Sequence, residues 1–209
     1  MRRRRQLLVF VKAPRLAQAK RRLAAGIGDV AAWRFHRTTM RGTLARLADD
    51  ARWQTSVYVT PDRFAVLGGC WPPGLARRPQ GSGDLGARMS RAFRERPPGP
   101  VVLVGTDIPS LTAAHVERAF RALGQADVVF GPATDGGYWL IGLARRRTRS
   151  IAFKDVRWST EWALSDTRAA LGRDHTVASI DTLWDVDDVV GYERLGRAGF
   201  TRTSLSSGG

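Results

Sequence analysis

The chain has 209 residues, of which 43% are hydrophobic, and a formal net charge of +15. This length suits one domain, and the hydrophobic content supplies a packed core and excludes wholesale disorder. The longest apolar run, residues 7–11, is far too short to cross a bilayer, so we predict no membrane span. The charge suggests anionic partners, but 31 of the 34 basic residues are arginines spread along the chain, which favours a composition bias.

The ends of the chain and its cysteine content bear on domain organisation and location. Residues 1–5 form a basic preamble, and the apolar run behind them soon meets Lys12, which is not typical of a signal peptide. Cys70 is the only cysteine, so an internal disulfide is excluded and a reducing compartment fits. We therefore predict a cytoplasmic protein with one domain over residues 6–199 and a flexible Ser/Gly-rich tail over residues 200–209.

Short apolar runs alternate with segments of helical spacing along the chain. The predicted strands cover residues 7–11, 53–59, 101–104, 128–130, 138–143 and 176–180. The predicted helices cover residues 16–25, 29–48, 84–93, 112–123, 159–171 and 186–195. This alternation predicts a single-domain, three-layer α/β/α fold with a mostly parallel sheet. Because such sheets bind ligands beyond the carboxyl ends of their strands, the loops there are the candidate sites.

The clearest buried strand, residues 101–104, leads directly to an aspartate. Gly105 lets another group approach the backbone closely, and Pro109 stiffens the turn around Asp107. A carboxylate held there suits Mg²⁺ or Mn²⁺, which prefer hard oxygen ligands and usually keep waters and substrate phosphates. The alternative interpretation is an aspartate that only caps the turn.

A second aspartate follows the strand at residues 128–130. Asp135, Gly136 and Gly137 form a strong turn signal, which predicts a hairpin loop before the next strand. The turn could also present Asp135 to a site, and the two interpretations are compatible.

Three further segments carry weaker signals. Glycines at the start of a helix, in residues 80–89, leave backbone amides open to an anion or a base edge. The basic residues of the first loop, in residues 12–22, could meet phosphates or form a solvated helix face. Asp185, Asp187 and Asp188 fit either a metal site or the start of a helix. The three histidines show no ligand spacing, and no Walker phosphate loop is present.

The order and spacing of five segments resemble one family far more specifically than any segment alone. These segments are residues 10–14 with 20–23, 80–89, 105–111, 131–143 and 158–161. They look like the small bacterial GT-A-like transferases of the arsenosugar-biosynthesis glycosyltransferase type, formerly a domain of unknown function. The resemblance covers about residues 7–195, and it extends more distantly to the guanylyltransferases for phospholactate and the molybdenum cofactor.

This resemblance implies a nucleotide-diphosphosugar transferase (GT-A) like fold and assigns roles to particular residues. The candidate catalytic residues are Asp107 and Asp135, and the candidate ligands of a divalent metal (Mg or Mn) are Asp107, Asp185 and Asp187. The residues that would contact the nucleobase are Gln80, Gly83, Asp84 and Gly86, and those that would contact phosphates are Lys12, Arg15, Lys20 and Arg22. Relatives usually have a glycine where Leu16-Ala17 stands and a threonine in place of Arg21, which leaves a degenerate enzyme as an alternative.

Two enzymatic functions and one non-enzymatic function fit the sequence. The first is a metal-dependent glycosyltransferase that uses a nucleotide sugar and an unknown acceptor. The second is a nucleotidyltransferase that activates a nucleoside triphosphate with the same groups. The third is a basic nucleic-acid-binding protein, but no helix-turn-helix, zinc module or aromatic single-strand platform is present, so we expect no specific nucleic-acid partner.

Overall fold

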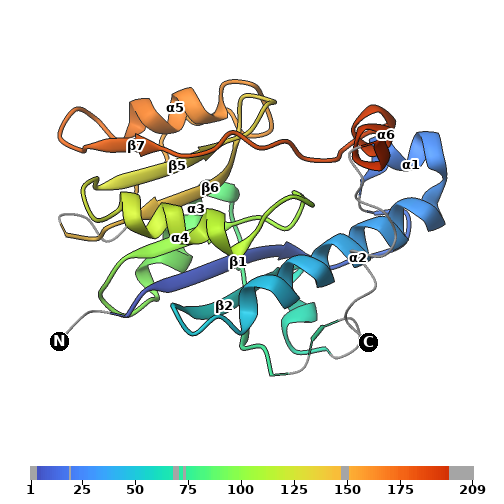
Figure 1. Ribbon diagram of the computed structural model, residues 1–209, viewed down its shortest axis with the longest axis horizontal. Helices are drawn as coiled ribbons and strands as arrows, with labels where there is room; N and C mark the ends of the chain where they lie inside the picture. The colour runs from blue at the N-terminus through green and yellow to red at the C-terminus, as the bar shows by residue number, and fades with distance from the viewer. Residues whose placement is uncertain (1–3, 19, 68–70, 73, 147–150, 198–209) are drawn as a thin grey trace.

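One sheet with the strand order β3-β2-β1-β4-β6-β5-β7 forms the centre of the molecule (Figure 1). The computed structural model describes residues 4–18, 20–67, 71–72, 74–146 and 151–197, so Cys70 and the predicted tail lie outside the described residues. The strands are β1 (Gln6–Lys12), β2 (Gln54–Thr60), β3 (Arg77–Pro79), β4 (Val101–Val104), β5 (Val128–Pro132), β6 (Tyr138–Leu143) and β7 (Val177–Ser179).

Strand direction gathers the functional loops at one edge of the sheet. Strands β1, β2, β3 and β4 are parallel to one another, whereas β6 is antiparallel to both β4 and β5. Since β6 reverses direction between them, β5 points the same way as β4. The carboxyl ends of β1, β2, β4 and β5 therefore share one edge, and β6 begins there.

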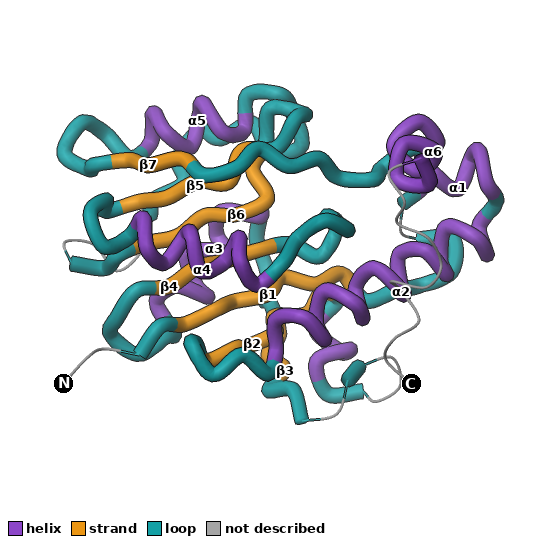
Figure 2. Tube along the Cα trace, in the orientation of Figure 1, coloured by secondary structure: helices purple, strands orange, loops and turns teal. Residues whose placement is uncertain are grey.

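Helices cover both faces of this sheet (Figure 2). They are α1 (Arg21–Ile27), α2 (Asp29–Ala48), α3 (Leu85–Arg94), α4 (Ala113–Ala122), α5 (Ala163–Ala170) and α6 (Val189–Arg197), with a 3₁₀ turn η1 (Asp62–Ala65). Leu44 of α2 and Phe120 of α4 pack on one face, and Phe93 of α3 packs on the other. The predicted three-layer α/β/α fold with a mostly parallel sheet is confirmed. None of the described helices is both long and apolar enough to span a bilayer.

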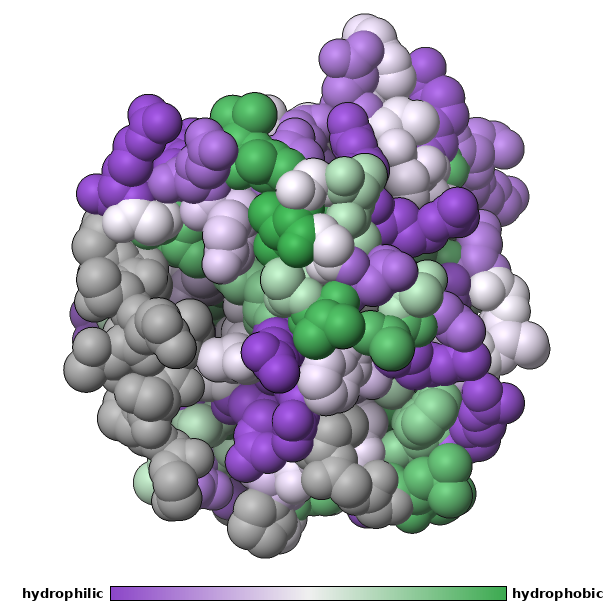
Figure 3. All heavy atoms as spheres, turned by 90° about the vertical axis from the view of Figure 1, so that its right-hand side faces the viewer, coloured by the Kyte–Doolittle hydropathy of each residue, from purple (hydrophilic) through white to green (hydrophobic). Residues whose placement is uncertain are grey.

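A third, smaller core lies beyond the carboxyl ends of the strands. Helices α1 and α6 pack there against the start of α2, around Leu23, Phe35, Val186 and Leu195. On the face of the molecule at this edge, hydrophobic residues lie among hydrophilic ones (Figure 3). The small core fixes the two chain segments that enter α1 and α6, and both segments contribute to the site.

Three helices begin later than the sequence pattern predicts. Helix α1 does not start at residue 16, because Ala17 (φ 57°) and Lys20 (φ 53°) are left-handed and break the helix. Helix α5 does not start at residue 159, because Ser159 is also left-handed (φ 61°). Helix α6 starts after residue 186, where the Asp188 carboxylate accepts a hydrogen bond from the Gly191 N–H at 2.9 Å. Each difference frees a loop segment at the edge where the site lies.

The sequence did not predict one feature of the sheet, the strand β3, but it did predict the hairpin between β5 and β6. The short edge strand β3 was not predicted, because Arg77-Arg78-Pro79 has no apolar pattern. The hairpin predicted around Asp135 is confirmed, since β5 and β6 pair as antiparallel neighbours on either side of it.

Candidate functional site

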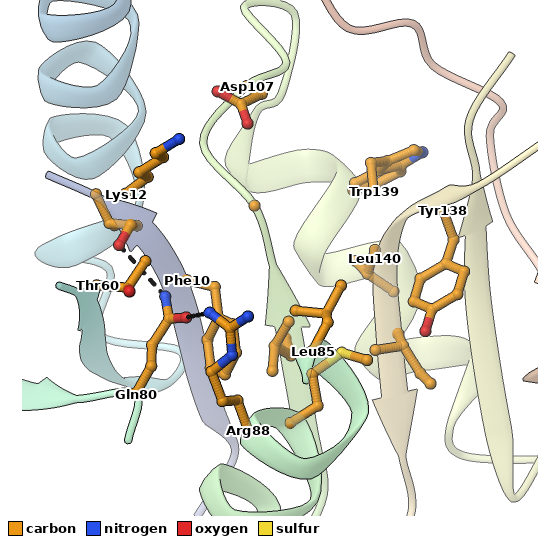
Figure 4. Close-up of a pocket in the computed structure, with 15 residues that line it drawn as sticks. Phe10, Lys12, Thr60, Gln80, Leu85, Arg88, Asp107, Tyr138, Trp139 and Leu140 are labelled. Atoms are coloured by element: carbon orange, nitrogen blue, oxygen red, sulfur yellow. Dashed lines mark hydrogen bonds between the residues drawn. The ribbon is translucent and has the colours of Figure 1, made fainter. Parts of the chain in front are cut away.

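Two adjoining cavities open at the carboxyl ends of the strands. The basic cavity has a volume of about 340 Å³, and its polar lining includes Lys12, Thr60, Gln80 and Arg88 (Figure 4). The acidic cavity has a volume of about 330 Å³, and its lining includes Asp135, Asp185, Trp158, Ser159 and Thr160. Both cavities share Leu85, Gly105, Asp107, Tyr138 and Trp139. The carboxylate of Asp107 therefore belongs to both.

A buried glutamine holds an arginine at the floor of the basic cavity. Gln80 is 4% exposed, and its Nε2 donates to the carbonyl oxygens of Val11 (3.3 Å) and Tyr58 (3.1 Å). Its Oε1 accepts from Arg88 Nη1 at 3.2 Å, and Arg88 Nε donates to the Asp84 carbonyl oxygen at 3.2 Å. Both donors of the Gln80 amide are used by β1 and β2, so Gln80 holds the Arg88 guanidinium in a fixed position.

Lys12 lines the basic cavity, and His36 lies behind it close to Asp107. Lys12 is the last residue of β1, and its side chain is exposed in the cavity, as Figure 4 shows. His36 comes from the buried face of α2, and its Nε2 lies 3.0 Å from the Lys12 carbonyl oxygen. Its Nδ1 lies 3.7 Å from Asp107 Oδ1, so the imidazole ring lies directly behind the carboxylate.

A lysine ammonium group lies between two of the predicted metal ligands. Lys20 Nζ is 3.2 Å from Asp107 Oδ1 and 2.5 Å from Asp187 Oδ1. Desolvation alone would lower the pKa of Lys20, but the two carboxylates outweigh it and raise the pKa above its ordinary value. Desolvation likewise opposes ionisation of Asp107, yet Lys20 lowers the pKa of that carboxyl. Both groups therefore remain charged, and the carboxylates of Asp107 and Asp187 are arranged around a cation.

The third predicted metal ligand has the opposite electrostatic environment. Loss of hydration and the neighbouring charge of Asp187 raise the pKa of Asp185 to about 6, and Asp135 contributes to the same effect. Asp135 itself is fixed by its own turn, in which its Oδ1 accepts from the Gly137 N–H at 2.9 Å. The acidic cavity thus concentrates negative charge.

These positions bring together most of the predicted site residues. Asp107, Asp135, Asp185, Lys12 and Gln80 line the cavities, and Lys20 and Asp187 form ion pairs at their margin. The chemistry predicted for each of these residues stays a prediction.

Other predicted nucleotide contacts have structural roles here. Arg15 lies over the Phe64 ring at 5.9 Å, and Arg22 is exposed on α1, so neither lines a cavity. Asp84 caps α3, with its side chain accepting from the Ala87 N–H at 2.8 Å.

The two predicted glycine contacts lie at the start of the same helix. Gly83 has a φ of 97° in the turn before α3. A Cβ at Gly86 would lie 2.6 Å from Phe153 Cβ, so this glycine permits close packing. Nucleotide contact by these residues stays a prediction.

Sequence reasoning missed several residues of the site. Arg88, His36 and Thr60 were not singled out, nor were Tyr138 and Trp139 given roles. His36 occupies a buried position of an amphipathic helix, where a core histidine is the ordinary expectation. Arg88 lies one turn after the Asp84 cap, and that spacing was the available signal.

The carboxylates fit a hard divalent cation that also has phosphate ligands. Among the described residues, no group of three His, Cys, Asp or Glu side chains is placed to hold a metal ion together. Asp107 and Asp187 nevertheless lie on either side of the Lys20 ammonium. Two carboxylates placed around one cation in this way fit the binding of a metal ion. Mg²⁺ and Mn²⁺ commonly take one or two carboxylates and complete their shell with substrate phosphates and water.

Comparisons with known proteins give the chain its family. Residues 43–160, more than half of the chain, match the family described as uncharacterized protein conserved in bacteria (DUF2064). No curated protein matches the chain. A crystal structure of a candidate nucleotide-diphospho-sugar transferase from Desulfovibrio desulfuricans G20 is 27% identical, with a TM-score of 0.79 over 96% of this chain and 91% of that chain.

More distant similarities show the fold alone. The 4-diphosphocytidyl-2C-methyl-D-erythritol synthase of Anaerococcus prevotii DSM 20548 is 9% identical, with a TM-score of 0.61 over 95% of this chain and 99% of that chain. Rv0371C of Mycobacterium tuberculosis H37Rv, solved in complex with manganese, is 16% identical, with a TM-score of 0.53 over 92% of this chain and 98% of that chain. The chain belongs to the bacterial DUF2064 family and has the nucleotide-diphosphosugar transferase fold that its sequence predicts.

Proposed function

We propose that the protein is a glycosyltransferase that binds a nucleotide sugar in the basic cavity and an acceptor in the acidic cavity. The observation that carries this proposal is the position of Asp107, which lines both cavities at the end of β4. A group bound in one cavity can therefore meet a group bound in the other beside this carboxylate. The Desulfovibrio relative, a candidate nucleotide-diphospho-sugar transferase, supports a nucleotide-using transferase.

The residues of the basic cavity match the parts of a nucleotide. Lys12 and Arg88 supply positive charge for a diphosphate, because phosphate oxygens accept charge-assisted hydrogen bonds. Gln80 fixes Arg88, and the apolar wall formed by Leu85, Met89 and Leu103 suits the flat face of a base. Asp107, with Asp187 or Asp185, would hold Mg²⁺ or Mn²⁺, which supplies positive charge to the leaving diphosphate when bound.

The transfer step uses groups from both cavities. The acceptor hydroxyl oxygen forms a bond to the anomeric carbon of the sugar while the bond from that carbon to the diphosphate oxygen breaks. The nucleoside diphosphate leaves with the bonding electrons, and Lys12 stabilises its charge. Asp135 accepts the hydroxyl proton, so the products are the glycoside, the nucleoside diphosphate and one proton.

Nucleotidyl transfer is the second candidate. The fold is shared with 4-diphosphocytidyl-2C-methyl-D-erythritol synthase, and the Lys20 ammonium beside Asp107 could meet an attacking phosphate. In that reaction an acceptor phosphate oxygen attacks the α-phosphorus of a nucleoside triphosphate and pyrophosphate leaves.

Nucleic-acid binding receives less support than either transferase. Many of the arginines that give the chain its charge contact aromatic rings within the fold. Examples are Arg52 over Trp53 at 4.8 Å and Arg194 over Trp184 at 4.7 Å. These contacts favour a composition bias over a dedicated nucleic-acid surface.

Thermal-shift measurements with nucleotides and nucleotide sugars, with and without Mn²⁺, test the proposal. We expect nucleoside diphosphates and their sugar conjugates to stabilise the protein only when Mn²⁺ is present, because Asp107 and a second carboxylate would hold the metal and its charge would favour the phosphates. Mass spectrometry of reaction mixtures then separates the two reactions: sugar transfer releases a nucleoside diphosphate, and nucleotidyl transfer releases pyrophosphate. If no nucleotide stabilises the protein, the proposal is wrong.

A further inference from the structure

The acidic cavity has a charge that opposes phosphate binding. Its lining contains the carboxylates of Asp107, Asp135 and Asp185, and none of the described residues that line it is lysine or arginine. The Lys20 ammonium, or a metal held by Asp107 and Asp187, would offset the charge of that pair, and Asp135 and Asp185 carry the negative charge that is left. The basic cavity, in contrast, contains Lys12 and Arg88. Since like charges repel in a partly desolvated site, a phosphate ester or a carboxylate is disfavoured in the acidic cavity.

Aromatic side chains form the apolar part of the same cavity. Trp139 is 5% exposed, and its Nε1 donates to the Asp181 carbonyl oxygen at 3.1 Å. A Cβ at Gly131 would lie 2.4 Å from Trp139 Cε2, so the absence of a side chain there lets the indole lie flat against β5. Trp158 packs on Phe153, with 5.7 Å between the ring centroids. The partly exposed Trp158 offers a ring face on which a sugar or aromatic ring can stack, and Trp139 forms an apolar wall beside it.

The loop that carries Trp158 is fixed before any ligand binds. Asp166 of α5 accepts hydrogen bonds from Arg157 N, Nε and Nη2 at 2.9–3.0 Å. Ser159, which also lines the cavity, is held at a φ of 61°, a conformation that costs free energy for a residue with a side chain. On its other side the loop packs against Gly136, where a Cβ would lie 2.2 Å from the Glu161 carbonyl oxygen. The cavity is therefore preformed.

We infer that the acidic cavity is the acceptor subsite and that its acceptor is a ring-bearing alcohol without a phosphate or carboxylate group. The inference rests on the proposed function and narrows it. The hydroxyl of such an acceptor lies beside Asp135, which takes its proton in the step written above. Nucleotidyl transfer needs an acceptor phosphate, and that phosphate would lie among Asp107, Asp135 and Asp185. The charge distribution thus favours sugar transfer.

Ligand-observed NMR with matched probe pairs tests the inference. The pairs are phenyl glucoside with its phosphate ester, and benzyl alcohol with benzyl phosphate, each at about 10 mM so that ligands of millimolar affinity are detected. We expect saturation transfer to the two alcohols from the acidic cavity, whereas the phosphates should bind in the basic cavity beside Lys12 and Arg88. The Ala133→Phe variant should abolish the alcohol signals and leave the phosphate signals unchanged, because Ala133 lines only the acidic cavity of the two.

A charge-reversal variant tests whether the charge of the acidic cavity, and not its shape, disfavours phosphate. Asp135→Lys should strengthen binding of benzyl phosphate about fivefold to tenfold, since it replaces a repulsive contact with an attractive one. The matched control is Asp49→Lys, which makes the same change on an exposed residue at the end of α2, before β2 and at the opposite edge of the sheet. The control should leave all four probes unchanged.

The outcomes distinguish this inference from the proposed function. Phosphate signals that Ala133→Phe abolishes, or alcohols that fail to bind at all, overturn the inference. So does alcohol binding that survives Ala133→Phe in a folded variant. Calorimetry with a nucleoside diphosphate and Mn²⁺ on the same samples tests nucleotide binding independently. If nucleotides fail to bind while the alcohols bind as expected, the proposed function is wrong but the ligand class of the cavity stands.

Discussion

The two cavities meet at Asp107 but are built in different ways. The basic cavity is made by the ends of neighbouring parallel strands, where Lys12 ends β1 and Gln80 follows β3. The acidic cavity is made by a hairpin turn, the loop before α5 and Asp185, which are distant from one another in the sequence. One cavity thus follows directly from strand order, whereas the other depends on tertiary packing.

The charge of the two cavities differs as much as their construction. On our proposal, Lys12 and Arg88 in the basic cavity favour phosphates, and Asp135 and Asp185 in the acidic cavity disfavour them. Lys20 offsets part of the negative charge at the boundary by pairing with Asp107 and Asp187. A site with this distribution of charge can bind an anionic substrate in the basic cavity and an uncharged substrate in the acidic cavity beside it.

Loss of the shared carboxylate should have the largest effect. We expect Asp107→Asn to weaken Mn²⁺-dependent binding of a nucleoside diphosphate by about 100-fold, or about 2.7 kcal/mol, because a metal ligand is removed. The Asp107 side chain is 52% exposed, so the substitution leaves the core intact. Titration calorimetry measures the affinity, and Asp49→Asn is the control for the lost charge. Equal affinities of the two variants would show that Asp107 is no metal ligand.

The next largest effect concerns the packing of Trp139, which lines both cavities. Gly131→Ala should lower the free energy of unfolding by about 2 kcal/mol, because the new methyl group overlaps the buried Trp139 ring. Urea denaturation measures this loss. At Gly105, a Cβ would meet nothing within 4 Å, so Gly105→Ala is the matched control and should change stability by less than about 0.5 kcal/mol. A neutral Gly131→Ala would show that Trp139 can move freely, and the acidic cavity would not be preformed.

The sequence predicted the fold and the strand-end residues of the site because local patterns encode them. Apolar runs identified β1 and β4, and their carboxyl ends carry Lys12 and Asp107. The turn signal at Asp135 was equally local, and the structure confirms the hairpin around it. These residues could be placed because direction within a parallel sheet puts them at a common edge.

The pairings across the site could not be predicted from the sequence. Lys20 and Asp187 are 167 residues apart, and their contact depends on the small core that holds α1 beside α6. Trp158 reaches the acidic cavity only because Arg157 is fixed to α5 by Asp166. No periodicity or motif records such contacts, since they arise from the packing of complete elements.

A smaller effect should be confined to nucleotide binding in the basic cavity. We expect Arg88→Lys to weaken nucleotide binding about tenfold, because an ammonium group cannot reach both Gln80 and the Asp84 carbonyl oxygen as the guanidinium does. Binding of the alcohol probes should not change. The control is Arg94→Lys on the exposed last turn of the same helix. A parallel loss of alcohol binding would show that the cavities are one site.

The smallest effect concerns the loop of the acidic cavity at low pH. The side-chain and backbone hydrogen bonds from Arg157 lower the pKa of Asp166 to about 2 from an ordinary value of 3.8. A carboxyl whose pKa is lowered by folding stabilises the native state above its unfolded pKa, and this contribution disappears as the pH falls through the folded pKa. The loop should therefore loosen between about pH 4 and pH 2, because protonated Asp166 no longer holds Arg157.

Fluorescence of Trp158 can follow this loosening, because the residue directly follows Arg157 and packs on Phe153. The difference spectrum between the parent protein and Trp158→Phe isolates its emission from that of the other tryptophans. We expect this emission to shift to longer wavelength below about pH 4 as water reaches the ring. In Asp166→Asn the shifted emission should already be present at neutral pH and should not change on acidification. An identical pH profile in the parent and in Asp166→Asn would mean that the loop is held by its packing against Gly136 and Phe153, and that the acidic cavity keeps its shape without the ion pair.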